Sequence, residues 1–131
     1  MVPWIFLGGA IGASIRYLVV LLLPTELKTG FPWPTLLINL TGSLLIGFLW
    51  AAFEKYPISE NVRNFIFIAI LGSFTTFSTF SNETALLIRD TSYSAAILNI
   101  ALHSGLGILL AFIGYIVGVK LIFPIWQNNN E

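Results

Sequence analysis

Apolar residues fill four long stretches of the 131-residue chain, and polar residues collect in the short segments between them. The four stretches cover approximately residues 3–23, 35–53, 63–88 and 95–119. Each is close to the roughly 20 residues that an α-helix needs to cross about 30 Å of hydrocarbon. No connecting segment is long enough for a water-soluble domain. The pattern therefore predicts an all-α membrane protein in which residues 1–131 form a single domain with four transmembrane helices.

A polar run interrupts the third stretch. Residues 72–83 read GSFTTFSTFSNE, in which hydroxyl residues alternate with phenylalanines. Hydrocarbon offers no hydrogen-bond partner, so every polar group in such a run must be satisfied within the protein. The run is therefore either a seam between packed helices or part of an ion path. Gly72 and the hydroxyls, which compete for backbone hydrogen bonds, indicate a helix that is broken near residues 72–76.

Composition excludes several classes of function. Apolar residues make up 56% of the chain and charged residues only 9%, with a mean hydropathy of +0.88, whereas soluble domains carry roughly 25% charged residues. The formal net charge is zero and no basic run is present, so no nucleic-acid partner is expected. The chain has no cysteine for disulfides or thiolate zinc sites. No nucleophile–base pair or metal-ligand cluster indicates an enzyme.

The first stretch is expected to be a retained helix. It has no basic residue before its apolar run and no small-residue cleavage signature, which a signal peptide would carry.

Lysines and arginines outside the spans give almost no orientation signal. With four spans the two ends lie on one side, together with Lys55, Arg63 and Lys120, whereas Lys28 and Arg89 lie on the other side. Three basic residues against two is too small a bias for the positive-inside rule. Two explanations stay equally open: insertion in both orientations with antiparallel pairing, or a weak signal in a small protein.

Polar side chains also lie inside the other spans. Arg16 is in the first span, where a guanidinium usually faces a bundle interior or a water-filled cavity. We interpret it as part of a vestibule that attracts anions, and the alternative is snorkelling to the membrane surface. Asn39, near the middle of the second span, offers two N–H donors and one acceptor. For His103, in the fourth span, a helix-packing hydrogen bond is the favoured interpretation.

Glycines recur at near-helical spacing in three spans, as Gly8 and Gly12, Gly42 and Gly47, and Gly114 and Gly118. Such spacing places small residues on one side of a helix and allows another backbone to approach closely. We therefore predict close helix packing at these faces.

Phe77 and Phe80 are three residues apart and share one face of the helix that follows the expected break. The faces of a phenyl ring are electron-rich and its edges are electropositive, so two edges pointing inward form a weak anion site. A lysine there would bind an anion too tightly for rapid exit. The pair thus favours an ion path over a simple packing seam.

Three segments together resemble the Fluc (CrcB) family of fluoride channels. They are GGAIGASIRY at 8–17, TLLINLTGS at 35–43 and the run at 72–83, and the likeness in length and four-span layout covers the whole chain. The resemblance implies a passive, fluoride-selective channel that exports fluoride and lowers its cytoplasmic level. It also implies a dual-topology antiparallel homodimer with two pores and one structural sodium ion at its centre, located in the inner (plasma) membrane of the cell.

Site residues follow from the same resemblance. Phe77 and Phe80 would meet fluoride with their ring edges, beside the amide donor Asn39. Gly72 and Thr75 would offer backbone carbonyls to the sodium ion. The other residues of the implied ion pathway are Ser78, Thr79, Glu83, Ser104 and Arg16, with Asn99 and His103 as further candidates in the fourth span.

Two other classes of membrane protein stay open. Small multidrug exporters are also short four-helix proteins that can pair antiparallel, but they are proton-coupled and are built around a membrane-embedded carboxylate. The one carboxylate near a span interior here is Glu83, late in the third span. A non-transporting structural subunit would explain the small-residue faces, but it would leave the clustered hydroxyls and paired phenylalanines unexplained.

Overall fold

The computed structural model describes residues 1–23 and 30–122, which are helical apart from short turns. Four helices are long and apolar enough to cross a membrane, and they cover Val2–Leu22, Trp33–Lys55, Glu60–Arg89 and Tyr93–Ile122. The predicted all-α architecture with four spans is confirmed, and the predicted boundaries differ by only a few residues. Lys28, which entered the charge count, lies outside the described residues.

Two spans are uninterrupted α-helices, α1 (Val2–Leu22) and α2 (Trp33–Lys55). Each has a proline in its first turn, where the missing N–H removes no helical hydrogen bond. For this reason α2 begins at Trp33 and includes Pro34, which the sequence pattern had placed in the preceding connection.

The third span is assembled from four pieces. The short helix α3 (Glu60–Asn64) continues into a π-helix, η2 (Phe65–Leu71), and then into α4 (Gly72–Phe74). A break follows, and the chain resumes as α5 (Phe77–Arg89). The predicted interruption of the third span is therefore confirmed.

Two threonines produce this break. Thr75 (φ −81°, ψ 157°) and Thr76 (φ −150°, ψ 115°) are extended, whereas Gly72 keeps helical angles (φ −64°, ψ −31°). The Thr75 hydroxyl donates to the carbonyl of Leu71 at 2.9 Å, and the Thr76 hydroxyl accepts from the backbone N–H of Thr79 at 3.2 Å. The second bond is an N-cap that starts α5. Hydroxyl side chains, more than the glycine, thus set where the helix stops.

The fourth span is continuous. It consists of α6 (Tyr93–Ala101), a second π-helix, η3 (Leu102–Leu106), and α7 (Gly107–Ile122). A tight turn joins it to α5, in which Arg89 donates to Asp90 at 2.8 Å. This hydrogen bond, together with the arginine charge, holds the pKa of the Asp90 carboxyl below its usual value.

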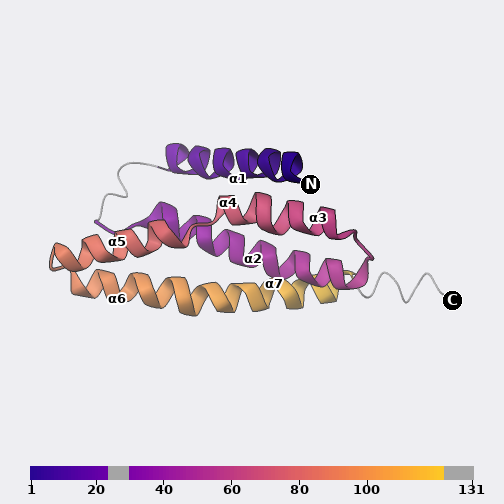
Figure 1. The fold of residues 1–131 in the computed structure, drawn as a ribbon. Helices are drawn as coiled ribbons and strands as arrows, with labels where there is room; N and C mark the ends of the chain where they lie inside the picture. Colours follow the sequence, from indigo (N-terminus) through magenta and orange to yellow (C-terminus); the bar gives the residue numbers. More distant parts are fainter. Residues whose placement is uncertain (24–29, 123–131) are drawn as a thin grey trace.

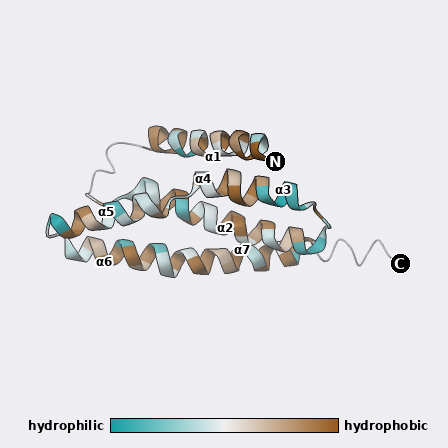
Figure 2. Ribbon diagram, in the orientation of Figure 1, coloured by the Kyte–Doolittle hydropathy of each residue, from teal (hydrophilic) through white to brown (hydrophobic). Residues whose placement is uncertain are grey.

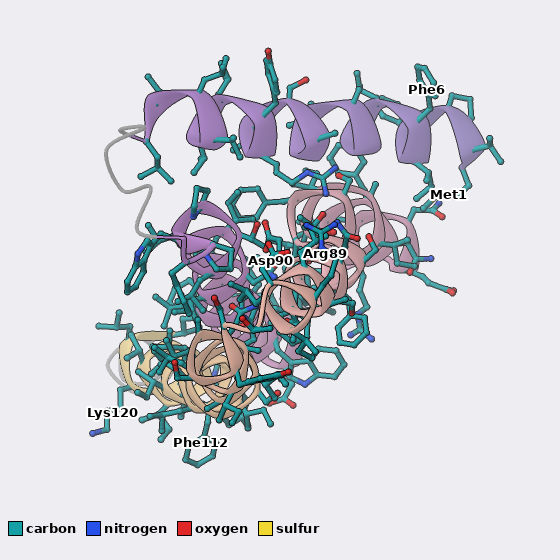
Figure 3. The ribbon with its side chains drawn as sticks, turned by 90° about the vertical axis from the view of Figure 1, so that its left-hand side faces the viewer. Met1, Phe6, Arg89, Asp90, Phe112 and Lys120 are labelled. Atoms are coloured by element: carbon teal, nitrogen blue, oxygen red, sulfur yellow. The ribbon has the colours of Figure 1, made fainter. Side chains whose placement is uncertain are left out.

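The helix α2 lies in the middle of the bundle. Figure 1 shows α3 and α4 on one side of it and α7 on the other, with α5 next to α6. The most extensive helix pair is α2 with α7. The first helix, α1, packs on the outside against η2 and α4. Figure 3 shows α1 along its length while the other spans are seen end-on, so α1 crosses them steeply.

Glycines bring the helix backbones together. A Cβ atom at Gly47 would collide with the carbonyl oxygen of Ala111, and one at Gly114 would collide with that of Leu44. Since these clashes involve backbone atoms, a larger side chain would force α2 and α7 apart. Gly12 in α1 packs against η2 and α4 in the same way. The predicted close packing at these glycines is confirmed.

Large apolar side chains mostly point outward. Only 11% to 33% of the apolar window of each span is buried within the chain. Figure 2 shows hydrophobic colours along the spans, with hydrophilic positions at the ends of the bundle and along α5. An outward apolar surface of this kind suits lipid or a protein partner rather than water. The chain is accordingly a multi-pass membrane protein.

Candidate functional site

A cavity of about 510 Å³ opens between α2, the break in the third span, the start of α5, η3 and the start of α7. We call it the polar groove. Its lining includes Asn39, Ser43, Thr75, Thr76, Phe77, Phe80, His103 and Ser104. Of the residues that sequence analysis singled out, it thus brings together the amide, both phenylalanines and one serine of the fourth span. Gly72 also lines it.

Asn39 holds the break by pairing with the backbone of Thr76. Its Nδ2 donates to the Thr76 carbonyl at 3.0 Å, and its Oδ1 accepts from the Thr76 N–H at 2.8 Å. These two bonds satisfy the N–H and the carbonyl of Thr76, which would be paired within the helix if the helix were continuous. One N–H of the amide is left over, because an asparagine Nδ2 carries two. That N–H is what Asn39 has available for an anion.

Two carbonyl groups at the break lose the donors that a continuous helix would supply. The N–H of Thr76, four residues after Gly72, donates to Asn39 instead. The N–H of Thr79, four residues after Thr75, donates to the Thr76 hydroxyl. The carbonyls of Gly72 and Thr75 therefore lack the N–H donors that residues four positions on supply in a continuous helix. Both residues border the polar groove.

The two phenylalanines lie against each other in the groove. The Phe77 and Phe80 rings have centroids 5.5 Å apart and planes at 57°. Phe77 is 79% exposed, and Phe80 is only partly buried. Phe74, which is 8% exposed, is buried elsewhere and does not line the groove. The alternation of phenylalanines along the run thus divides them between a packed face and an open one.

Ser78 and Thr79 lie outside the groove lining. Both hydroxyls bond to that of Thr76, at 3.2 Å and 3.0 Å. They are exposed and surround the helix cap. Within one chain they therefore extend the polar surface beyond the groove rather than line it.

Three further polar residues are buried to different degrees: Asn99 fully, and Glu83 and His103 in part. Thr35 donates to Glu83 Oε1 at 2.6 Å, while Oε2 is buried without a partner among the described residues. Asn99 is 0% exposed and donates to Thr84 Oγ1 at 2.9 Å. His103 Nδ1 lies 3.0 Å from the Asn99 carbonyl. This bond joins two residues of the same span, so the helix-packing bond expected of His103 stays a prediction, and His103 borders the groove.

Arg16 lies apart from this site. It is partly exposed on α1 and is not among the groove lining, and no ion pair of the described residues involves it. Ser104, in contrast, is exposed and lines the groove.

Thr35 and Thr84 do not line the groove but bond to Glu83 and Asn99, and the sequence pattern did not single them out. Each lies four residues from a predicted site residue: Thr35 precedes Asn39, and Thr84 follows Phe80. Helical spacing could have indicated them, because residues four apart lie on one face.

Comparison with known proteins gives consistent matches. Residues 3–115 match the family model described as "CrcB-like protein, Camphor Resistance (CrcB)". A protein of Parabacteroides distasonis is 39% identical over 118 residues, which cover 90% of this chain and 92% of that protein. A protein of Salinibacter ruber is 44% identical over 111 residues, 85% of this chain and 84% of that protein. Both carry the name "Fluoride-specific ion channel FluC".

Proposed function

The chain belongs to the CrcB family of membrane ion channels, which are not enzymes, and we propose that it is a passive fluoride-selective channel. In the cell it would release fluoride across the inner membrane and lower the cytoplasmic concentration. Relatives named as fluoride-specific channels support this proposal, and the polar groove within the spans is the observation that carries it.

The groove offers what a desolvated anion needs. A bare ion in a medium of low dielectric constant is destabilised by tens of kcal/mol in Born estimates, so the passage must replace water at each step. The Asn39 amide, the hydroxyls and the phenyl ring edges are donors or electropositive groups that can do so in series. The described lining contains no Lys, Arg, Asp or Glu. An anion would therefore be held weakly enough to leave.

A second copy of the chain is expected to cover the groove. Phe77, Ser78, Thr79 and Ser104 are exposed at membrane depth in one chain. Polar groups facing lipid would stay unsatisfied, which the bilayer penalises strongly. The near-equal split of basic residues supports insertion in both orientations and hence an antiparallel homodimer with two grooves and two pores.

The break also suits a structural sodium ion. Carbonyl oxygens freed at broken membrane helices can hold such a cation. Gly72 and Thr75 would each supply one carbonyl, and an antiparallel partner would supply the same pair again. The bound charge would stabilise the dimer centre.

Membership of the CrcB family argues against the small multidrug exporter as the alternative. The position of Glu83 agrees, since this carboxylate accepts from Thr35 and does not line the groove.

Liposomes that contain the purified protein test the proposal. Fluoride should leave passively, chloride should be retained, and a cationic exporter substrate should not be pumped by a proton gradient. Equal fluoride and chloride efflux would contradict a fluoride-selective channel.

Dual topology has its own test. A tag at the C-terminus should be reached only in part from either side of sealed vesicles. Complete protection from one side would rule out insertion in both orientations.

A further inference from the structure

The Phe80 ring is stacked on a histidine. Its centroid lies 4.3 Å from that of His103, with 33° between the planes, the shortest ring separation among the described residues. Phe80 comes from α5 and His103 from η3, and both line the polar groove. Because the imidazole covers one face of the phenyl ring, that electron-rich face is shielded.

His103 is itself fixed by the backbone. Its Nδ1 lies 3.0 Å from the Asn99 carbonyl, and a carbonyl only accepts, so Nδ1 carries the proton. Nε2 is buried and lies toward the backbone of Thr35. The bond at Nδ1 and the burial of Nε2 therefore fix the imidazole beside Phe80.

The remaining bonds lead back to Phe80. Asn99 Nδ2 donates to Thr84 Oγ1 at 2.9 Å, and Thr84 Oγ1 donates to the Phe80 carbonyl at 2.8 Å. Asn99 and Thr84 are 0% and 7% exposed, and neither lines the groove. The contacts thus run from the Phe80 backbone through Thr84, Asn99 and His103 to the Phe80 ring.

The geometry points to Thr84, Asn99 and His103 as positioning residues that hold the Phe80 ring edge toward the ion path. We call these three residues the Phe80 support network. The inference rests on the proposed function, because it assigns the network's effect to fluoride passage. A loose ring would turn its electron-rich face to the anion for part of the time, and selectivity would fall along with flux.

Thr84 gives the cleanest test, since it is buried away from the groove and cannot touch the ion. Thr84→Val keeps the shape but removes both hydrogen bonds, and Thr84→Ser keeps the hydroxyl as the matched control. Thr84→Val should lower fluoride efflux about tenfold, because this factor corresponds to the free energy of one aromatic contact. It should also reduce the fluoride-to-chloride ratio. Thr84→Ser should stay close to the unmodified protein. Equal efflux and selectivity from the two variants would overturn the inference.

His103 tests the stacking itself. His103→Ala should lose flux and selectivity, and His103→Phe should restore most of both, because it keeps a ring over Phe80 without the nitrogens. If His103→Phe were as impaired as His103→Ala while both stayed dimeric, the nitrogens would act directly and positioning by stacking would be wrong.

A spectroscopic readout separates this inference from the proposed function. In protein with 3-fluorophenylalanine in place of Phe80, a held ring should give two ¹⁹F signals because it flips slowly, and Thr84→Val should merge them into one. A single averaged signal already present without Thr84→Val would contradict the network even if fluoride flowed. Two signals in a protein that conducts no fluoride would uphold the network and refute the channel.

Discussion

Helix α2 packs its two ends by different means. Near Gly47 it meets α7 backbone to backbone, with Ala111 and Leu44 carbonyls in the space a side chain would need. Near Asn39 it meets the broken third span through side-chain hydrogen bonds, including the two between Asn39 and the backbone of Thr76. The glycine contact leaves no room for a side chain at Gly47 or Gly114, whereas the Asn39 amide lines the polar groove, which extends as far as Ile46 and Ala111. One helix thus combines close backbone packing around Gly47 with the proposed ion path around Asn39.

Removing the amide contact should have the largest effect. Asn39→Leu leaves the N–H and the carbonyl of Thr76 unsatisfied. Each buried group without a partner lowers the stability by about 1–3 kcal/mol. We expect fluoride efflux to fall at least about 100-fold, on the scale of losing one preorganised donor, and the dimer to become less stable. Thr41→Leu, on the exposed side of the same helix, is the control. Wild-type efflux from Asn39→Leu would mean that the amide does not form the path.

Filling the glycine contact should reduce stability and leave selectivity intact. Gly114→Ala places a Cβ against the Leu44 carbonyl, and overpacking of this kind costs about 3 kcal/mol. Gly105→Ala in the same span meets nothing within 4 Å and serves as the matched control. Thermal unfolding in detergent measures the loss, and efflux from the surviving dimer measures the path. A change in the fluoride-to-chloride ratio would show that the two ends of α2 are not independent.

A buried phenylalanine outside the groove should give the smallest effect. Phe74→Ile retains apolar bulk in the packed face of the run, so we expect roughly 1 kcal/mol of lost stability and nearly unchanged efflux. Thermal unfolding and efflux on the same preparation check both parts. Efflux that collapsed in a stable dimer would place Phe74 in the path after all.

The spans and the break could be predicted from the sequence, because bilayer thickness sets the length of an apolar run and hydroxyl clusters weaken a helix. The break lies within the predicted range 72–76, but the residues that produce it could not be predicted, since Thr75 and Thr76 end the helix through side-chain bonds while Gly72 stays helical. The π-helices η2 and η3 could not be predicted either, because the spacing of apolar residues in the sequence does not distinguish them from α-helix.

The sequence indicated which types of residue lie near the groove, but not which residues contact each other there. Asn39 and Thr76 are 37 positions apart, and nothing in one sequence links them. Ser78 and Thr79 look equivalent to Thr76 along the run, but the cap turns them out of the groove lining. Glu83 was expected in the ion pathway, and its bond from Thr35 depends on how α2 and α5 meet. The ion-pathway roles of all the named residues, and those of the sodium carbonyls, stay predictions.

The most direct measurement is fluoride efflux from Phe80→Ile, recorded together with the size of the protein on size-exclusion chromatography. Isoleucine keeps apolar bulk but has no electropositive ring edge, so efflux should collapse while the dimer is retained, and Phe77→Ile should behave in the same way. Loss of efflux only through dissociation would make Phe80 a packing residue. Two dimeric variants with full fluoride efflux would contradict the ring-edge mechanism.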